Sequence, residues 1–289
     1  MKTFSEFLKE SVDFRLGGSK KSVAYKYKAR DKKELIKIIL DLVEERGYEG
    51  DFNDIDVSEM RDFGSLFNMD FSLTVEFDGD ISNWDMSNAE NLGAMFASMK
   101  KFNSDISTWD VSNVVQMDSM FYLAEKFNQD LNTWDTSNVE LMNGMFANAY
   151  LFNGDISQWD VSNVTNMQSM FYAASKFDCD ISSWDTRKVT DMSNMFCQAE
   201  SFNQDISNWN VSNVENMESM FNMAYKFNQP IGKWDMTNVL NICNMFHQAK
   251  SFDQNLKTWK NFKAKRNYGT YEECPIRKEY KARRNARVL

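Results

Sequence analysis

The chain has 289 residues, of which 33 are Lys or Arg and 42 are Asp or Glu, so its formal net charge is -9 at pH 7. With 11 Gly and 2 Pro it is neither collagen-like nor Pro/Gly-rich and disordered, and no apolar run approaches the roughly 18 residues of a membrane-spanning helix. The single histidine, His247, excludes sites that need two imidazoles, and the acidic balance argues against general nucleic-acid binding.

The cysteines predict free thiols in a reducing compartment. The four are Cys179, Cys197, Cys243 and Cys274, and none belongs to a CxxC pair. This spacing indicates neither a zinc knuckle nor a disulfide-rich secreted scaffold. The N-terminus also lacks the apolar core of a secretory signal and the lipobox cysteine of a lipoprotein. We therefore expect a cytoplasmic location in the host or producing cell, without membrane association.

Residues 1–21 are expected to form a flexible amphipathic leader. The segment MKTFSEFLKES resembles the capsid-targeting leaders of T4-like phage head proteins, which a prohead protease cuts after Leu/Ile-x-Glu. Leu8-Lys9-Glu10 stands directly before Ser11. The resemblance implies a processing site at Leu8, Glu10 and Ser11 and a place in the virion. The alternative is an ordinary mobile N-terminus.

Residues 22–50 are expected to form a strand–helix cap. Residues 24–30 alternate like a strand, and residues 31–46 carry apolar side chains at helical spacing behind a suitable N-cap, Asp31. A stack of repeats leaves its first core face open, and such a cap covers it. A degenerate repeat follows, with four extra residues within 68–76 that we expect to form a bulge or loop.

Residues 51–259 are built from a 25-residue repeat. All eight tryptophans follow this spacing: Trp84, Trp109, Trp134, Trp159, Trp184, Trp209, Trp234 and Trp259. Two series of phenylalanines keep the same period, and one unit, Phe152 to Lys176, reads FNGDISQWDVSNVTNMQSMFYAASK. A fixed period of this length is the signature of a solenoid whose units contact only their neighbours.

Each unit divides into a predicted strand and a predicted helix. Residues 155–161 contain Ile156, Trp159 and Val161, which is typical of a short strand with a turn. Residues 164–174 place apolar side chains at i, i+3, i+6, i+7 and i+10, which is one face of a helix. The prediction is an α/β fold, a solenoid of about eight 25-residue strand–helix repeats with parallel strands.

The polar and sulfur columns of the repeat each have a structural and a functional interpretation. Asp recurs before the Ile-Ser step and again after Trp, and Ser-Asn follows. These side chains either satisfy turn N–H groups coil after coil or form a cation ladder such as a calcium site. The methionines favour a core column over a cofactor or metal site. The tryptophans are expected to be largely buried, with an exposed aromatic stripe as the alternative.

The unit FNGDISQWDVSNVTNMQSMFYAASK resembles the BspA-type leucine-rich-repeat surface protein family, in the mycoplasma-lipoprotein branch that also includes bacterial and phage proteins. The likeness covers about residues 51–259. It implies a leucine-rich-repeat-like solenoid that binds or adheres to a partner. It implies no enzymatic activity. From the residue columns we expect no cofactor and no metal site.

Residues 260–289 are expected to form a basic C-terminal cap or tail. They contain ten Lys or Arg and three Glu, a net charge of +7, so the rest of the chain carries -9 minus 7, or -16. This split suggests that the tail has its own partner. The candidates are a nucleic acid, which could bind only here, an acidic protein surface, or the acidic repeats of a neighbouring copy. The alternative is a solvated, partly helical tail.

These patterns favour a non-enzymatic repeat protein that presents an extended surface to a protein or glycan. The alternative is a phage virion or head-associated accessory protein whose leader is cleaved after Glu10. An enzyme is a third hypothesis, which the uniformity of the coils disfavours. Arg187 and Lys188 interrupt the Ser-Asn column, and Pro230 interrupts the Asp column. These departures are the best places to look for site specificity, and the alternative is that they are drift, as single variations in a repeat array usually are.

Overall fold

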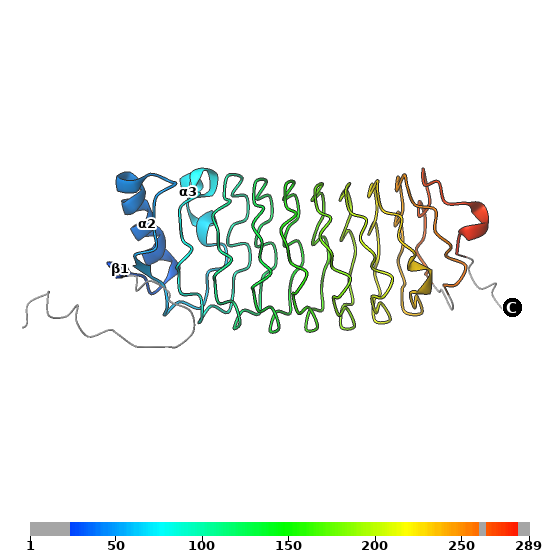
Figure 1. Ribbon diagram of the computed structural model, residues 1–289, viewed down its shortest axis with the longest axis horizontal. Helices are drawn as coiled ribbons and strands as arrows, with labels where there is room; N and C mark the ends of the chain where they lie inside the picture. The colour runs from blue at the N-terminus through cyan, green and yellow to red at the C-terminus, as the bar shows by residue number, and fades with distance from the viewer. Residues whose placement is uncertain (1–23, 260–263, 283–289) are drawn as a thin grey trace, which may run out of the picture.

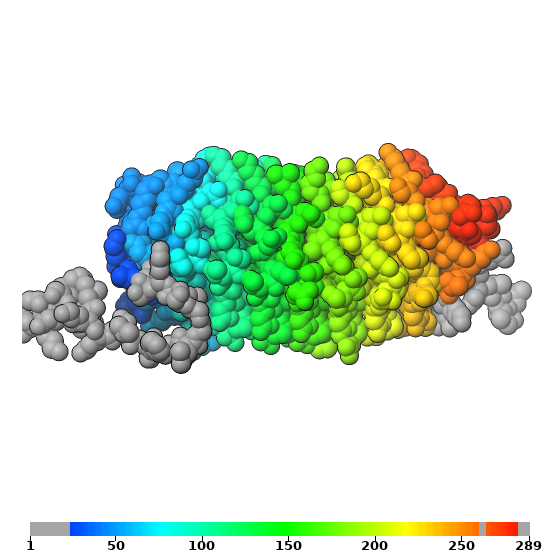
Figure 2. Space-filling view, in the orientation of Figure 1, coloured from blue at the N-terminus to red at the C-terminus, as the bar shows by residue number. Residues whose placement is uncertain are grey.

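A computed structural model describes residues 24–259 and 264–282, so the predicted leader with Leu8, Glu10 and Ser11 lies outside the described residues. Figure 1 shows an elongated stack of coils, with a helix at one end and the C-terminal segment at the other. On the face seen in Figure 2, side chains cover the coils continuously. Among the described residues, no helix has the length and apolar character needed to span a membrane.

The N-terminal end of the stack consists of a two-stranded sheet and a helix. Strand β1 (Tyr27–Lys28) pairs in parallel with β2 (Ile55–Asp56), and helix α2 (Lys32–Arg46) lies between them in sequence. Asp31 caps α2, because its Oδ1 accepts the N–H of Glu34 at 2.9 Å. The prediction of this helix and its N-cap is confirmed.

The four extra residues within 68–76 form short helical elements. A 3₁₀ helix, η1 (Leu66–Met69), is followed by helix α3 (Phe71–Glu76). Asp70 begins α3, since its Oδ1 accepts the N–H groups of Ser72 and Leu73 at 2.8 and 3.2 Å. The remaining described elements are the 3₁₀ helices η2 (Ile231–Lys233) and η3 (Lys278–Tyr280).

The prediction of an α/β solenoid with one strand and one helix per repeat is wrong. Between α3 and η2 the described residues contain turns and isolated bridges but no helix and no extended strand. Residues 164–174, predicted as a helix, are a series of turns in which Ser169 and Ala173 have φ of 56° and 55°. These left-handed residues are incompatible with a right-handed helix.

Hydrogen bonds between coils explain why no helix forms. The N–H groups of Ser169 and Phe171 donate to Ser193 and Met195 of the next coil at 2.8 and 2.9 Å. The intervening N–H of Met170 closes a turn onto Met167 at 3.2 Å. A helix would need each N–H to bond four residues back, whereas here alternate donors leave the coil. Both arrangements bury the same apolar positions, so periodicity alone does not separate them.

One parallel β-bridge joins each coil to the next at a fixed position. The bridged pairs from residue 62 onward are Asp62–Asn91, Asn91–Gln116, Gln116–Leu141, Leu141–Asn166, Asn166–Asp191, Asp191–Asn216, Asn216–Asn241 and Asn241–Arg266. The step is 25 residues in every pair after the first, which spans the four-residue insertion. The repeat length therefore equals one coil.

Stacked aromatic rings form the core. The tryptophans are 1–4% exposed, which confirms that they are largely buried. Trp159 lies parallel to Trp134 with ring centroids 6.2 Å apart, and Phe146 stacks on Phe152 at 3.8 Å. Each indole N–H donates to a backbone carbonyl of the preceding coil; Trp159 Nε1 reaches the oxygen of Leu131 at 2.8 Å. The column is thus fixed by both packing and hydrogen bonds.

The basic C-terminal segment contains one further coil. Residues 264–282 follow the repeat register, with Asn267, Thr270 and Tyr271 at positions that hold Met, Met and Phe in earlier coils. The Thr270 hydroxyl donates to the carbonyl of Ile242 at 2.9 Å, so this polar substitution is satisfied inside the stack. These residues form the turns of a coil, and the three-residue η3 is the helical element described among them.

We expect Ser169→Gly to raise the free energy of unfolding by about 0.5–1 kcal/mol. A left-handed φ costs a residue with a Cβ roughly 1–2 kcal/mol, and the greater freedom of Gly in the unfolded chain offsets part of the gain. The preceding coil already has glycine at this position, Gly144, with φ of 64°. Urea unfolding measures the change. Gln168→Gly, at the exposed neighbour that lacks a positive φ, should lower stability, and equal losses in both variants would contradict the explanation.

Candidate functional site

The aspartate columns make turns. Asp160 Oδ1 accepts the N–H of Ser162 at 2.9 Å, and Asp155 Oδ1 accepts the N–H of Ser157 at 2.9 Å. The same i to i+2 bond recurs at Asp80, Asp85, Asp105, Asp110, Asp135, Asp180, Asp185, Asp205 and Asp235. This confirms the interpretation of these residues as Asx turns. Across residues 24–259 and 264–282, no three His, Cys, Asp or Glu side chains are grouped to hold a metal ion.

The asparagines of the Ser-Asn steps join neighbouring coils. Asn163 Nδ2 donates to the carbonyl of Ser137 at 2.7 Å, and Asn138 Nδ2 donates to that of Ser112 at the same distance. A second asparagine column follows the first phenylalanine of the unit, where Asn153 Oδ1 accepts the N–H of Asp178 at 2.7 Å. Sequence reasoning missed this second column, although Phe-Asn recurs as regularly as Ser-Asn.

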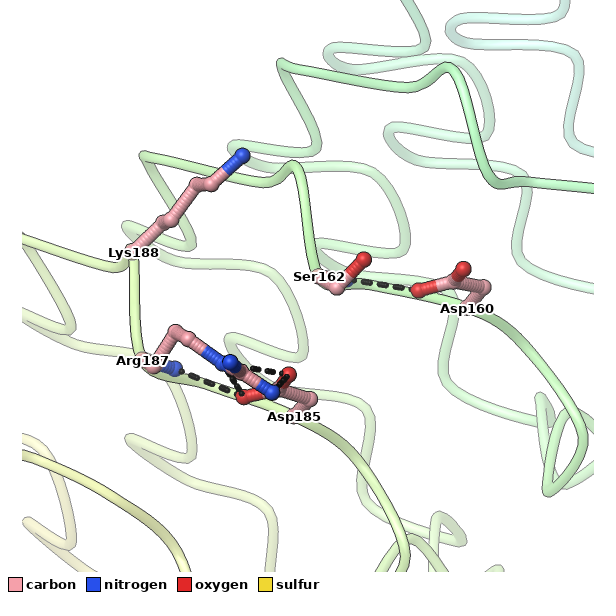
Figure 3. Close-up of a pocket in the computed structure, with 5 residues that line it drawn as sticks. All are labelled: Asp160, Ser162, Asp185, Arg187 and Lys188. Carbon is pink, nitrogen blue, oxygen red and sulfur yellow. Dashed lines mark hydrogen bonds and ion pairs between the residues drawn. The ribbon is translucent and has the colours of Figure 1, made fainter.

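The interruption at Arg187 and Lys188 coincides with a hollow on the side of the stack. Asp160, Ser162, Asp185, Arg187 and Lys188 line it, and its volume is about 410 Å³. Figure 3 shows that these residues come from equivalent turns of two neighbouring coils, and that Lys188 points away from the Arg187–Asp185 pair. The departures from the repeat therefore place a guanidinium and an ammonium on this part of the surface.

Arg187 and Asp185 form an ion pair within one turn. Arg187 Nε donates to Asp185 Oδ1 and Oδ2 at 2.9 and 2.7 Å, and the Arg187 N–H donates to Oδ1 at 3.2 Å. The guanidinium lowers the pKa of the Asp185 carboxyl and the carboxylate raises the pKa of Arg187. Both side chains are well solvated, at 66% and 30% exposed, so the pair orients the turn more than it stabilises the fold.

Lys188 is the cation that the hollow leaves available. Its Nζ donates to Asn163 Oδ1 at 2.5 Å, and within the described part of the chain no carboxylate lies within 4.0 Å of it. Asn163 is itself held by its bond to Ser137. Lys188 thus places an exposed ammonium where the other coils have a neutral amide. Its hydrogen bond to Asn163 holds this ammonium in position.

A second hollow lies on the same side of the stack, nearer the N-terminus. It has a volume of about 500 Å³, and the lining residues are Arg61, Asn88, Glu90, Asn113, Val115, Asn138 and Glu140. Its asparagines occupy the column that Lys188 interrupts, so both hollows share one lateral face. Arg61 pairs with Glu90, whereas Glu140 has no ion-pair partner among the described residues. The sequence analysis did not predict this surface. The one feature of the sequence that points to it is the residue two places after the Ser-Asn step, which varies from unit to unit.

The tryptophans and Pro230 do not contribute to these hollows. Every indole lies in the core, and Pro230 precedes η2 without lining either surface. The thiol of Cys197 is also internal, and burial raises its pKa to about 11, which keeps it protonated. What the lateral face presents is a row of amides, hydroxyls and separated charges, which suits recognition by hydrogen bonds and ion pairs.

The sequence matches the model of the family described as "Mycoplasma protein of unknown function, DUF285", once over residues 62–183 and again over residues 175–279. The chain belongs to this family. The two matches together include the coils from the bridge at Asp62 into the C-terminal coil. None of the curated proteins compared with the chain matches it. The DUF285 repeat therefore corresponds here to stacked coils built from turns.

Proposed function

We propose that this DUF285 protein is a non-enzymatic binding protein that presents the lateral face of its stack to a partner protein. The observation that carries the proposal is the placement of both hollows on one face, along the same asparagine column. One hollow offers the ammonium of Lys188 and the other offers the carboxylate of Glu140. A rigid row of opposite charges and amides gives specificity to a polar interface.

The regularity of the stack supports a binding role. Backbone hydrogen bonds set the spacing between coils, so side chains in one column repeat at the coil spacing along the whole face. A protein partner is favoured over a glycan because the charges vary along the face, with Glu140 and Lys188 two coils apart. The resemblance of the repeat to BspA-type surface proteins agrees with a binding role.

Site-specific photo-crosslinking tests this function. A benzophenone amino acid is placed at Asn113 or Lys188 on the lateral face and, as controls, at Lys126 or Lys176, which are exposed and do not line either hollow. Irradiation of producing cells should give one protein adduct from the lateral positions and none from the controls. Adducts of equal yield from all four positions, or from none, would contradict the proposal.

Restoring the repeat residue provides a second readout. Lys188→Asn recreates the amide found in the other coils, so it should leave the fold intact and remove the ammonium. We expect the crosslink from position 113 to fall about fivefold, as for the loss of one exposed ion pair of about 1 kcal/mol. Lys176→Asn is the control and should leave that crosslink unchanged.

A second candidate function, a virion-associated protein, is favoured by the sequence Leu8-Lys9-Glu10 before Ser11. In this proposal the leader is removed after Glu10 and the stack acts inside the particle. Mass spectrometry of the protein recovered from particles should find Ser11 as the first residue. Recovery with Met1 or Thr3 at the N-terminus would contradict it.

A further inference from the structure

Each of seven successive coils has a five-residue loop between two stacked phenylalanines. In one coil the rings of Phe121 and Phe127 lie 3.9 Å apart, so residues 122–126 form the loop between them. The same pairing, at 3.8–4.1 Å, brackets the loops 97–101, 147–151, 172–176, 197–201, 222–226 and 247–251. The phenylalanines are buried in the core, so the loops project from it. We call the row that these loops form the loop edge.

The loop edge is straight. The phenylalanine rings beside it, from Phe102 to Phe252, lie 5.9–6.1 Å apart at every step. Helix α3 adjoins its N-terminal end, because Glu76, the last residue of α3, forms an ion pair with Lys101 of the first loop. Figure 1 shows the coils along a nearly straight axis, with α3 on one long edge of the stack. A flat surface can therefore contact α3 and all the loops together.

The loop edge is basic, whereas the rest of the repeat region is acidic. The loops hold six of the ten Lys and Arg in residues 77–259 and two of the 23 Asp and Glu, a net charge of +4. The other residues of this range include four Lys or Arg and 21 Asp or Glu, a net charge of -17. The loop lysines are all exposed, and they are Lys100, Lys101, Lys126, Lys176, Lys226 and Lys250. The edge can therefore attract anions although the chain as a whole is acidic.

Most of these lysines are available to a ligand. Lys100 and Lys101 form ion pairs with Glu125 and Glu76. The other four have no carboxylate within 4.0 Å among residues 24–259 and 264–282, and they are Lys126, Lys176, Lys226 and Lys250. Glu200 is the remaining carboxylate of the loops and is exposed. Four available ammonium groups thus face one available carboxylate.

Apolar side chains are exposed among these lysines. Tyr150 and Leu151 occupy the positions that Lys100 and Lys101 hold in the first loop, and Leu151 is 48% exposed. The large hydrophobic side chains exposed in the loops and at the α3 end are Met69, Phe71, Tyr122, Tyr150 and Leu151, five of the eight in the described part of the chain. Phe71, the first residue of α3, is 84% exposed. Lysines with aromatic and aliphatic side chains between them are typical of a surface that lies at the interface of a lipid bilayer.

This combination favours a lipid surface over other anions. Leu151 offers a nucleic acid no ring on which a base can stack. An acidic protein would need carboxylates that match lysines two coils apart, whereas anionic lipids diffuse within the bilayer to each ammonium. The Asp column also turns away, since η2, which follows its position at Pro230, lies toward the opposite long edge in Figure 1. Salt screens much of the repulsion from charges beyond about 8 Å.

We propose that the loop edge binds the surface of a membrane that contains anionic phospholipids, with the stack lying along the bilayer. The lysines contact head-group phosphates, while Phe71, Tyr150 and Leu151 enter the interfacial region. Such an edge needs neither a spanning helix nor a lipid anchor, so the sequence signals that predict no membrane association do not bear on it. None of its residues lines the two hollows, so the lateral face stays free for a partner protein.

Sedimentation of the full chain with vesicles tests the proposal. The vesicles contain equal parts of phosphatidylglycerol and phosphatidylcholine, or phosphatidylcholine alone, and binding is expected to the first kind. Lys126, Lys176 and Lys226 are replaced together by serine, which Ser201 and Ser251 show is compatible with this position. Each lysine near an anionic surface contributes about fivefold to binding, so the partition coefficient should fall about a hundredfold.

A matched variant removes the same charge outside the loops. It combines Lys188→Asn, Lys233→Ser and Lys257→Ser, and each new residue occurs at the equivalent position of another coil. Its binding to anionic vesicles should stay within about threefold of the wild type. Equal losses in the two triple variants, or no loss in either, would overturn the proposal, because the affinity would then come from net charge or from another part of the chain.

A fluorescent residue locates the contact. Dansylalanine is placed at Leu151 or at Gln158, an exposed residue equivalent to Lys233 of η2. Anionic vesicles should shift the emission to the blue at position 151 and leave it unchanged at position 158. Equal shifts at both positions would overturn the proposal. A response at position 151 to a single-stranded oligothymidylate, with none to vesicles, would replace it with a nucleic-acid site.

Discussion

Replacing Trp159 by alanine is expected to lower the free energy of unfolding by about 3–5 kcal/mol. The indole is 3% exposed and lies between Trp134 and Trp184, with ring centroids 6.2 and 6.4 Å away. Truncation removes this packing and leaves a cavity that neighbouring coils, held by backbone bonds, fill poorly. It also leaves the carbonyl of Leu131 without the indole N–H at 2.8 Å. Denaturant unfolding followed by circular dichroism gives the change.

The position of the tryptophan along the stack provides the control. Trp259→Ala removes an equally buried ring, but near the C-terminal end, where the loss disrupts one terminal coil and not the contact between two halves. We expect a smaller loss there, and an unfolding transition that stays single. Trp159→Ala should broaden the transition or divide it into two. Negligible effects at both positions would show that the aromatic column does not hold the coils together.

The second large effect is expected at the junction between helix α2 and the first coil. Arg46 donates from its two terminal nitrogens to the carboxylate oxygens of Asp54 at 2.7 and 2.9 Å, and also to the carbonyl of Asp51 at 2.6 Å. The side chains of Arg46 and Asp54 are only 18% and 14% exposed. Arg46→Ala removes this bidentate partner from the partly buried Asp54 carboxylate. We therefore expect the free energy of unfolding to fall by about 2–3 kcal/mol.

The same junction predicts a dependence on pH. The Arg46 guanidinium lowers the pKa of Asp54 below its ordinary value of 3.8. The folded state therefore binds this proton less readily than the unfolded chain does. The stabilisation is present above pH 3.8 and is lost as the pH falls through the folded pKa. Asp54→Asn should be less stable at pH 7 and should lack this part of the acid-induced loss.

Lys101→Ala, which removes an exposed ion pair with Glu76, is the control and should change stability by less than about 1 kcal/mol. Parallel acid-induced losses in wild type and Asp54→Asn would contradict the assignment.

Local patterns predict the parts of this fold that depend on neighbouring residues. Asp31 as an N-cap, the Asx turns such as Asp160 to Ser162, and the burial of the tryptophans all follow from short-range chemistry and periodicity. The helix predicted over residues 164–174 does not form, because alternate backbone N–H groups of this segment bond to carbonyls 24 residues ahead. Local propensity contains no information about those partners.

The candidate site is predictable only in part for a related reason. Arg187 and Lys188 stand out because they break a column, and the structure places them together on one hollow. Glu90, Val115 and Glu140 sit at a position that varies from unit to unit, so no departure from a pattern identifies them. They meet only because the coil spacing brings every twenty-fifth residue to the same face.

The sequence by itself determined the period, the composition of each column, the capped first helix and the opposite charges of the body and the C-terminus. The tertiary structure decided which backbone conformation the 25 residues of each repeat adopt. Turns win over helix because stacking pairs alternate N–H groups of each coil with the next, and this cooperative bonding outweighs the local preference for i to i+4 bonds. It also decided that the stack continues past Trp259, since the pairing of Ile242 with Arg266 shows that the basic segment begins as one more coil.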